Sequence, residues 1–140
     1  MKRLFVISTA ALLLVAIQIP GFAHHSVSAQ FDSSKATTIT GMITKVDWAN
    51  PHAWLYMTVR NGNQSVTWHV QISAPGALKQ VGIEKGMIDL TSPVAVEVWP
   101  AFSDEVGFKT GHGRMLTLPD GRKLDVSDKW PMGKGPNNPR

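Results

Sequence analysis

The sequence predicts a mostly β domain: five short strands closed into a barrel, with one short helix between the third and fourth strands. Apolar and polar residues alternate over several short segments, and 12 Gly and 9 Pro among 140 residues favour turns over long helices. One segment after the third strand has residues typical of the start and the end of a short helix. This order is that of an OB-like barrel. An open antiparallel sandwich is the rival fold, because strand order cannot be read from one sequence.

The first strand is predicted over residues 37–48 and is expected to bend. The segment is rich in Thr, Ile and Val, which favour strands. Its apolar positions change parity along the chain, from Ile39, Gly41 and Ile43 to Val46 and Trp48. A change of parity indicates an extra residue, so we expect a β-bulge near Thr44 and Lys45.

The second and third strands are predicted to form a hairpin. Residues 53–60 alternate apolar side chains with Trp54, Tyr56 and polar residues, which is the period of a half-buried strand. Asn61-Gly62 is a strong reversal signal, and the alternation resumes over residues 66–72.

The predicted helix follows this hairpin and is brief. Ser73 is expected to cap its first turn, where Pro75 is tolerated. Leu78 and Val81 are expected to face the core, and Gly82 suits the position just past the helix end.

The fourth and fifth strands come after the helix. Residues 94–98 carry Val at alternate positions, and residues 113–118 and 122–126 flank a turn at Pro119-Asp120-Gly121. An Asp in such a turn usually bonds its own backbone, so Asp120 is assigned a structural role. Three tryptophans are expected in the core, namely Trp48, Trp68 and Trp99.

The first 23 residues have the pattern of a secretory signal peptide. A positive start precedes a mostly apolar run over residues 4–19, and small residues precede a cut after Ala23. The run is shorter than the ~20 residues of a spanning helix, so we expect cleavage, no lasting membrane anchor and a periplasmic or secreted product. The predicted parts are a signal peptide (1–23), an N-terminal segment (24–34), the barrel (35–126) and a flexible tail (127–140).

Composition argues against several classes of function. Cysteine is absent, which excludes disulfides, thiolate metal sites and a cysteine nucleophile. The formal net charge is +4 with no long basic run, which disfavours a nucleic acid partner. Nucleotide-binding and hydrolase motifs are absent and no convergent catalytic set is evident, so an enzyme is disfavoured.

Four groups of residues carry a family resemblance. They are His24-His25-Ser26, Thr40-Gly41 with Lys45-Val46-Asp47-Trp48, Asn50-Pro51-His52-Ala53-Trp54-Leu55, and Leu118-Pro119-Asp120-Gly121-Arg122-Lys123-Leu124. The chain resembles a family of small exported bacterial proteins catalogued as a domain of unknown function, which is itself similar to OB-fold proteins of the bacterial envelope. The resemblance implies secretion and a compact β domain, and it brings no activity or catalytic residues.

The histidines suggest a metal site. If cleavage follows Ala23, His24 becomes the first residue and offers its amine and its ring nitrogen to one ion. Such a pair suits copper(II), which prefers nitrogen ligands in a plane. A third nitrogen would come from His25, from His52 at the start of the second strand, or from His112, expected in the loop before the fifth. The alternative is that these histidines are solvated or hold turns and bind no metal.

A second hypothesis concerns the outer face of the hairpin. If the apolar set faces the interior, Trp54, Tyr56 and His69 stand on the face where OB-folds bind oligonucleotides or oligosaccharides. Flat rings stack on sugars and also anchor protein partners. The alternatives are that the C-terminal tail or a neighbouring subunit covers these rings, or that the faces are reversed and Trp54 is core. The sequence therefore predicts a non-enzymatic binding module, with copper as the first ligand and an envelope glycan or protein as the alternative.

Overall fold

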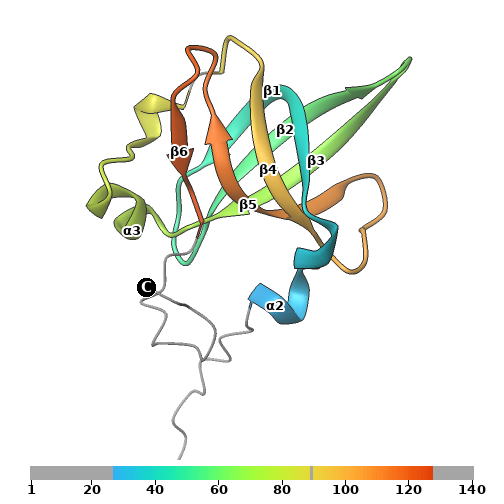
Figure 1. Ribbon diagram of the computed structural model, residues 1–140, viewed down its shortest axis with the longest axis horizontal. Helices are drawn as coiled ribbons and strands as arrows, with labels where there is room; N and C mark the ends of the chain where they lie inside the picture. Colours follow the sequence, from blue (N-terminus) through green and yellow to red (C-terminus); the bar gives the residue numbers. More distant parts are fainter. Residues whose placement is uncertain (1–26, 89, 128–140) are drawn as a thin grey trace, which may run out of the picture.

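Strands make up most of the part of the chain that the structure, a computed structural model, describes, namely residues 27–88 and 90–127. In chain order the elements are α2 (Val27–Gln30), η1 (Ser33–Lys35), β1 (Thr37–Asp47), β2 (Ala53–Asn61), β3 (Gln64–Ile72), α3 (Pro75–Gln80), η2 (Lys85–Met87), β4 (Val94–Pro100), β5 (Lys109–Thr117) and β6 (Lys123–Asp125). Figure 1 shows α3 at one end of the barrel and α2 below it. No helix within the described residues is long and apolar enough to cross a membrane.

The sheet closes on itself, which makes it a barrel and excludes the open sandwich (Figure 1). Its strands follow the order β3-β2-β1-β4-β5-β6, and an additional parallel pairing joins β3 to β5. This pairing aligns Trp68 with Lys109 and Gln71 with His112. Because β3 and β5 otherwise stand at opposite ends of the five-strand order, the pairing covers two strand edges. The predicted OB-like barrel, with a short helix between the third and fourth strands, is confirmed.

β1 bends so that its two halves pair with different strands. Its first half pairs with β4 and its second half with β2, and Gly41 pairs with both. The register against β2 shifts between Ile43 and Lys45, which confirms the predicted bulge. Thr44 lies in this shift, and its hydroxyl donates to the backbone carbonyl of Tyr56 at 3.1 Å.

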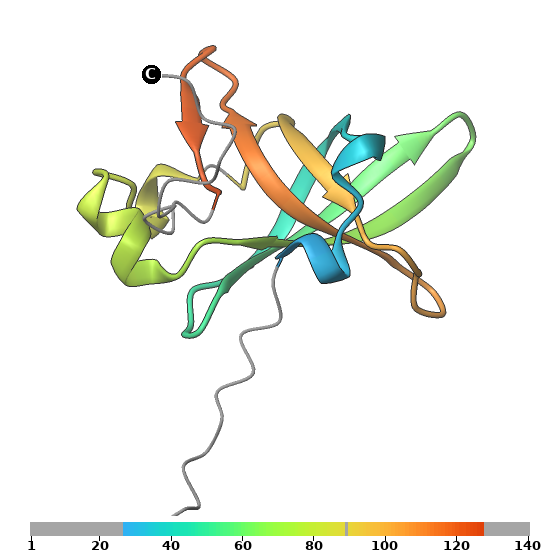
Figure 2. The ribbon, with the colours of Figure 1, turned by 60° about the horizontal axis from the view of Figure 1, so that its bottom comes forward.

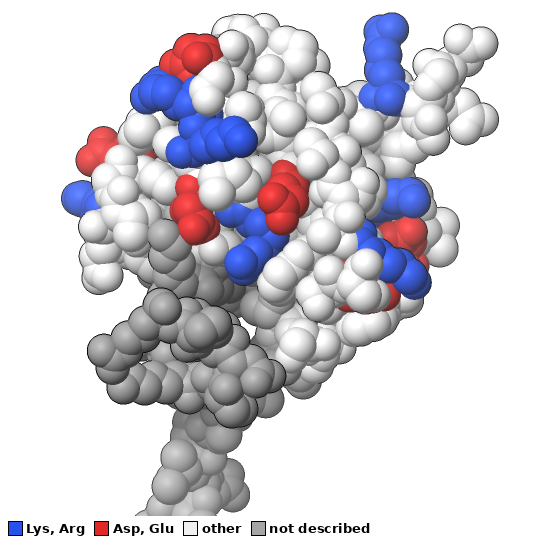
Figure 3. Space-filling view, in the orientation of Figure 1, with Lys and Arg blue, Asp and Glu red and all other residues white. Residues whose placement is uncertain are grey.

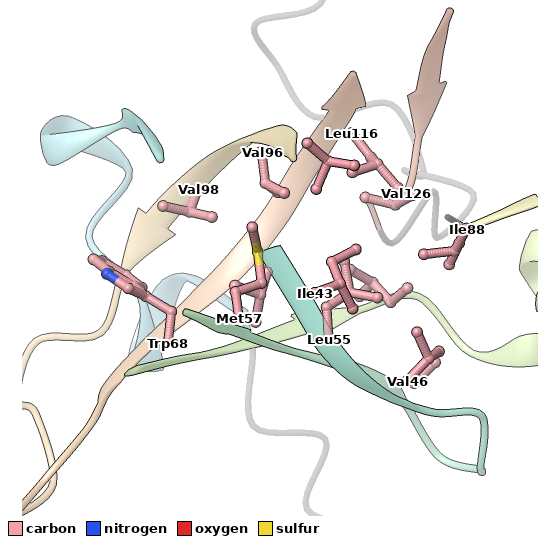
Figure 4. Packing of buried hydrophobic residues seen from close by; sticks show 14 of the residues in the cluster. Ile43, Val46, Leu55, Met57, Trp68, Ile88, Val96, Val98, Leu116 and Val126 are labelled. Carbon is pink, nitrogen blue, oxygen red and sulfur yellow. The ribbon is translucent and has the colours of Figure 1, made fainter. Parts of the chain in front are cut away.

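The barrel is filled by the side chains that alternation assigned to the inside (Figure 4). Those with no exposed surface include Ala53, Leu55, Met57, Val70, Ile72, Val96, Val98 and Leu116. Trp68 is buried among them, and Trp48 packs partly against the cluster. The prediction that Trp99 is core is wrong: its neighbour Val98 points inward, so Trp99 is half-buried on the outer side of β4.

Two glycines of β5 leave room for the core. A Cβ atom on Gly113 would lie 2.9 Å from Ile72 Cγ2 and 3.0 Å from Val70 Cγ1. A Cβ atom on Gly111 would lie 3.2 Å from the ring of Trp68. Any larger residue at these positions would push β5 away from β3, because a close-packed interior has no space to give.

The prediction that Ser73 caps the short helix is wrong. The N-cap of α3 is Ala74, which makes no side-chain capping bond. The backbone of Ser73 is used by the sheet instead: its N–H donates to the carbonyl of Val126 at 2.9 Å and its carbonyl accepts from the N–H of Ala53 at 3.3 Å. The residue therefore continues the sheet rather than opening the helix.

The end of this helix also differs from the prediction at one position. Leu78 is buried as expected, whereas Val81 is 53% exposed, because α3 ends at Gln80 and Val81 is already outside the helical repeat. Gly82 has a positive φ of 80°, as expected just past a helix end. Ile83, two residues beyond Val81, occupies the core instead.

The turn before β6 is held as predicted. Asp120 Oδ1 accepts from the backbone N–H of Arg122 at 2.9 Å, and Gly121 has a φ of 85°. The side chain of Arg122 also donates from Nε to Asp120 Oδ2 at 2.7 Å. The two hydrogen bonds from Arg122 hold the pKa of the Asp120 carboxyl below its usual value. Asp120 therefore has a local structural partner.

We expect Gly41→Ala to lower the free energy of unfolding by about 1–3 kcal/mol. A Cβ atom there would overlap the backbone carbonyl oxygen of Thr58 and lie 3.1 Å from Val59 Cα, so the backbone of β1 or β2 would have to shift. Gly76→Ala is the matched control, because nothing lies within 4 Å of its Cβ position and Ala favours the helix. Urea unfolding measures both, and equal stability of the two variants would contradict the expectation.

Candidate functional site

The outer face of β2, β3 and β5 carries the aromatic and polar side chains on which the candidate site is built. Trp54 lies opposite Gln71, and Gln71 lies opposite His112, so one row runs across three strands. In the next row Tyr56 lies opposite His69. Trp54, Tyr56 and His69 are all half-buried, on the opposite side of the hairpin from the fully buried core residues.

Three rings pack together at one part of this face, and we call them the His69 cluster. The Tyr56 and His69 rings meet edge to face with centroids 4.7 Å apart. Phe108, just before β5, stacks on the other side of His69 with centroids 3.8 Å apart. The ammonium group of Lys45 lies 4.9 Å from the centroid of the Tyr56 ring. The cluster thus joins the hairpin to the segment between β4 and β5.

The environment of His69 disfavours its charged form. Burial lowers the pKa of the imidazole below its ordinary value of 6.5, and the carboxylate of Glu105 opposes this effect without cancelling it. His69 is therefore mainly neutral at pH 7. A neutral imidazole both donates and accepts a hydrogen bond.

A second cluster, the His112 cluster, consists of the rings of Phe31, Trp99 and His112 and the guanidinium of Arg114. The His112 centroid lies 5.5 Å from that of Phe31 and 6.0 Å from that of Trp99. The guanidinium carbon of Arg114 lies 4.3 Å from the centroid of the Trp99 ring. His112 itself is only 1% exposed.

The expectation that His112 lies in a loop is wrong. β5 begins at Lys109, because its first residues already pair with β3, and His112 is the fourth residue of the strand. The two flanking glycines look like loop residues in the sequence, whereas in the structure they make room for the core.

The segment before β1, whose helix α2 is blue in Figure 2, covers His112 through the ring of Phe31. The N–H of Asp32 donates to the carbonyl of Pro100 at 2.8 Å, and the N–H of Phe102 donates to the carbonyl of Gln30 at 3.1 Å. Between them Phe31 forms a β-bridge with Ala101 and is 3% exposed. The N-terminal segment is thus fastened to the end of β4, with Phe31 packed on the imidazole.

The predicted metal ligands are only partly within the described residues. His52 is half-buried and immediately precedes β2, and β3 lies between β2 and the strand that carries His112. Over residues 27–88 and 90–127, no three His, Cys, Asp or Glu residues are grouped to hold a metal ion. His24 and His25 lie outside the described residues, as do the predicted signal peptide and tail residues 128–140.

A shallow hollow of about 350 Å³ lies elsewhere, beside α3 and η2. It is lined by Trp48, Pro75, Gly76, Lys79, Ile83, Glu84 and Lys85. None of these residues belongs to the His69 or the His112 cluster. The hollow is therefore separate from the candidate site.

Charges of both signs are mixed on the face that Figure 3 displays. Several form local pairs, such as Asp32 with Lys35 at 3.3 Å and Asp120 with Arg122 at 2.7 Å. This pattern differs from the basic stripe typical of nucleic-acid-binding proteins.

Fold and outer face together define a small OB-like barrel whose His69 cluster lies on β2 and β3, the strands that OB-folds use for ligands. The family of the chain is also shown. The model of the DUF6152 family, a family of unknown function, matches residues 11–111, so the protein belongs to this family. This confirms the predicted domain of unknown function. No significant match is found among curated proteins or among solved structures.

Three residues of the clusters were not found by the sequence analysis. Phe31 stands alone among polar residues, and Phe108 precedes a strand whose start was misplaced. Arg114 lies between inward-facing Gly113 and Leu116, so the two intervening residues break the alternation. That break is a sequence signal for a second bulge, and it would have pointed to Arg114.

We expect Phe108→Ala to raise the pKa of His69 toward 6.5, because removing the stacked ring lets water reach the imidazole. NMR titration of the His69 ring measures the change. Phe102→Ala is the control, because Phe102 is 64% exposed in the same segment. An unshifted pKa of His69 in the native protein would contradict the expectation.

The same shift fixes the sign of a pH effect on stability. The unfolded state binds a proton at His69 more readily than the folded state does. The contribution of His69 to the free energy of unfolding is therefore fully present above about pH 6.5 and is lost as the pH falls through the lower native pKa.

Proposed function

We propose that the protein is an exported binding protein whose outer face of β2 and β3 binds a glycan of the bacterial envelope. One observation carries the proposal: Trp54 and Tyr56 stand half-exposed on the face opposite the core, on the strands with which OB-folds bind oligosaccharides. Aromatic rings present a flat apolar surface that stacks on the apolar face of a sugar. The signal-peptide pattern of residues 1–23 supports export.

Polar groups beside the rings favour a glycan over a protein partner. Thr67 is exposed and lies opposite Thr58, and Gln71, opposite Trp54, keeps 8% of its surface exposed. With neutral His69, these side chains both donate and accept hydrogen bonds, as a hydroxylated ligand requires. A protein partner would be expected to meet a broader apolar surface.

The test compares neighbouring residues of β2 that face opposite ways. Trp54→Ala is expected to weaken binding to oligosaccharides on a glycan array by about tenfold or more, because a stacking surface is lost. It should change stability much less than Leu55→Ala, for which the loss of a fully buried side chain predicts a decrease of about 2–5 kcal/mol in the free energy of unfolding. Asn63→Ala, at an exposed residue of the turn between β2 and β3, is the binding control.

Two outcomes would contradict this proposal. One is that the native protein binds no oligosaccharide on the array. The other is that Trp54→Ala abolishes binding to an envelope protein and leaves glycan binding unchanged. That result would assign the surface to a protein partner.

A second candidate function is copper binding at the mature N-terminus. The observation that favours it is the anchoring of Phe31 on His112, which fastens the segment just after the expected first residue. His24 precedes Val27 by three residues, a reach of about 10 Å. The amine and ring of His24, with a nitrogen from His25, His52 or His112, would suit copper(II). His52 is the more accessible of the two described partners.

Copper binding should depend on His24 being the first residue. Mass spectrometry of the secreted protein identifies that residue and any bound metal together. Calorimetric titration with copper(II) should then show tight binding that is lost in His24→Ala and when one extra residue precedes His24. His69→Ala is the control. Equal copper affinity of His24→Ala and the native protein would remove this candidate.

A further inference from the structure

Arg114 lies at a second bulge in the barrel and follows inward-facing Gly113, so it faces outward. The register between β4 and β5 shifts between Glu97 and Val98, whose partners are Met115 and Gly113, so Arg114 is the extra residue. Gly113 faces the core, since a Cβ atom there would meet Ile72. A bulge turns a side chain out of the regular alternation, and bulges are common beside binding sites. Arg114 is therefore directed to the outer face.

The ring of Trp99 holds the guanidinium of Arg114 in place. The guanidinium carbon lies 4.3 Å from the ring centroid, and both residues are half-buried. This geometry orients the planar guanidinium and reduces the rotamer freedom that a ligand would otherwise have to restrict.

The guanidinium of Arg114 forms no salt bridge in the described part of the chain, although the register places Glu97 opposite the bulge. Salt bridges there join Asp32 to Lys35, Asp104 to Lys109 and Asp120 to Arg122. None of them involves Arg114. A guanidinium is charged at any physiological pH, and its N–H groups form a fork that fits a carboxylate.

The register connects Arg114 to the proposed glycan face. Trp54 lies opposite Gln71, Gln71 opposite His112, and His112 opposite Trp99, so one row of the outer face runs from β2 to β4. Arg114 lies two residues beyond His112 on β5, so it is about 10 Å from Trp54 across the sheet and about 7 Å further along the strands. Phe31 covers His112 in the middle of this row, so a chain of several sugars stacked on Trp54 would reach Arg114 by passing around Phe31.

We infer that the glycan is acidic and that Arg114 receives a carboxylate of one of its uronic acid units. Arg114 is thus a specificity-determining residue, while Trp54 and Tyr56 provide stacking for acidic and neutral sugars alike. This inference rests on the proposed glycan-binding function and adds the chemical class of the ligand.

The test uses an array of uronic-acid-containing oligosaccharides together with their carboxyl-reduced counterparts. The native protein should bind the acidic members about tenfold more tightly, the effect of one charge-assisted bidentate contact. Arg114→Gln should lower the affinity for the acidic oligosaccharides to the level found for the carboxyl-reduced ones. The affinity for the reduced oligosaccharides should not change. That unchanged binding also shows that the variant is folded. Arg114→Lys, which keeps the charge and loses the fork, should fall between the two.

Lys79→Gln is the control, because it removes one positive charge from an exposed residue of α3, outside the outer face of β2, β3 and β5, and should leave both affinities as they are. Equal binding of acidic and reduced glycans by the native protein would overturn the inference, as would an acid preference that survives in Arg114→Gln. If either of these results is found and Trp54→Ala still abolishes glycan binding, the proposed function stands without the inference. If no glycan binds, both fail.

Discussion

The parallel pairing of β3 with β5 is the constraint on which the rest of the molecule depends. It closes the barrel, and it also brings the outer side of β5 next to the hairpin, so that Gln71 lies beside His112. The pairing requires β5 to approach the core closely, which Gly111 and Gly113 allow. Without this contact the His69 and His112 clusters would belong to separate sheet edges, and no continuous outer face would exist.

The sequence predicted those features whose causes are local. The Asn61-Gly62 turn and the alternation on either side define the hairpin, and the parity change in β1 locates its bulge. His112 was misplaced because the start of β5 is fixed by a strand from another part of the chain. Ser73 was misassigned for a related reason, since its backbone bonds to Val126 and Ala53 and thus continues the sheet.

The candidate site divides in the same way. Alternation alone predicts that Trp54, Tyr56 and His69 share a face of the hairpin. The rings and charge that surround them come from distant segments: Phe108 stacks on His69, and Arg114 stacks on Trp99. Such contacts follow from the closure of the barrel and have no counterpart in the spacing of residues along the sequence.

The fastening of the N-terminal segment has a consequence for the order in which the molecule assembles during synthesis. Gln30 and Asp32 bond to Phe102 and Pro100, about 70 positions later in the chain. A nascent chain that has emerged only as far as η2 can form the hairpin, but it has nothing to which these early residues can attach. The cover over His112 is consequently completed only after β4 has been synthesised, when the segment before β1 meets the end of that strand.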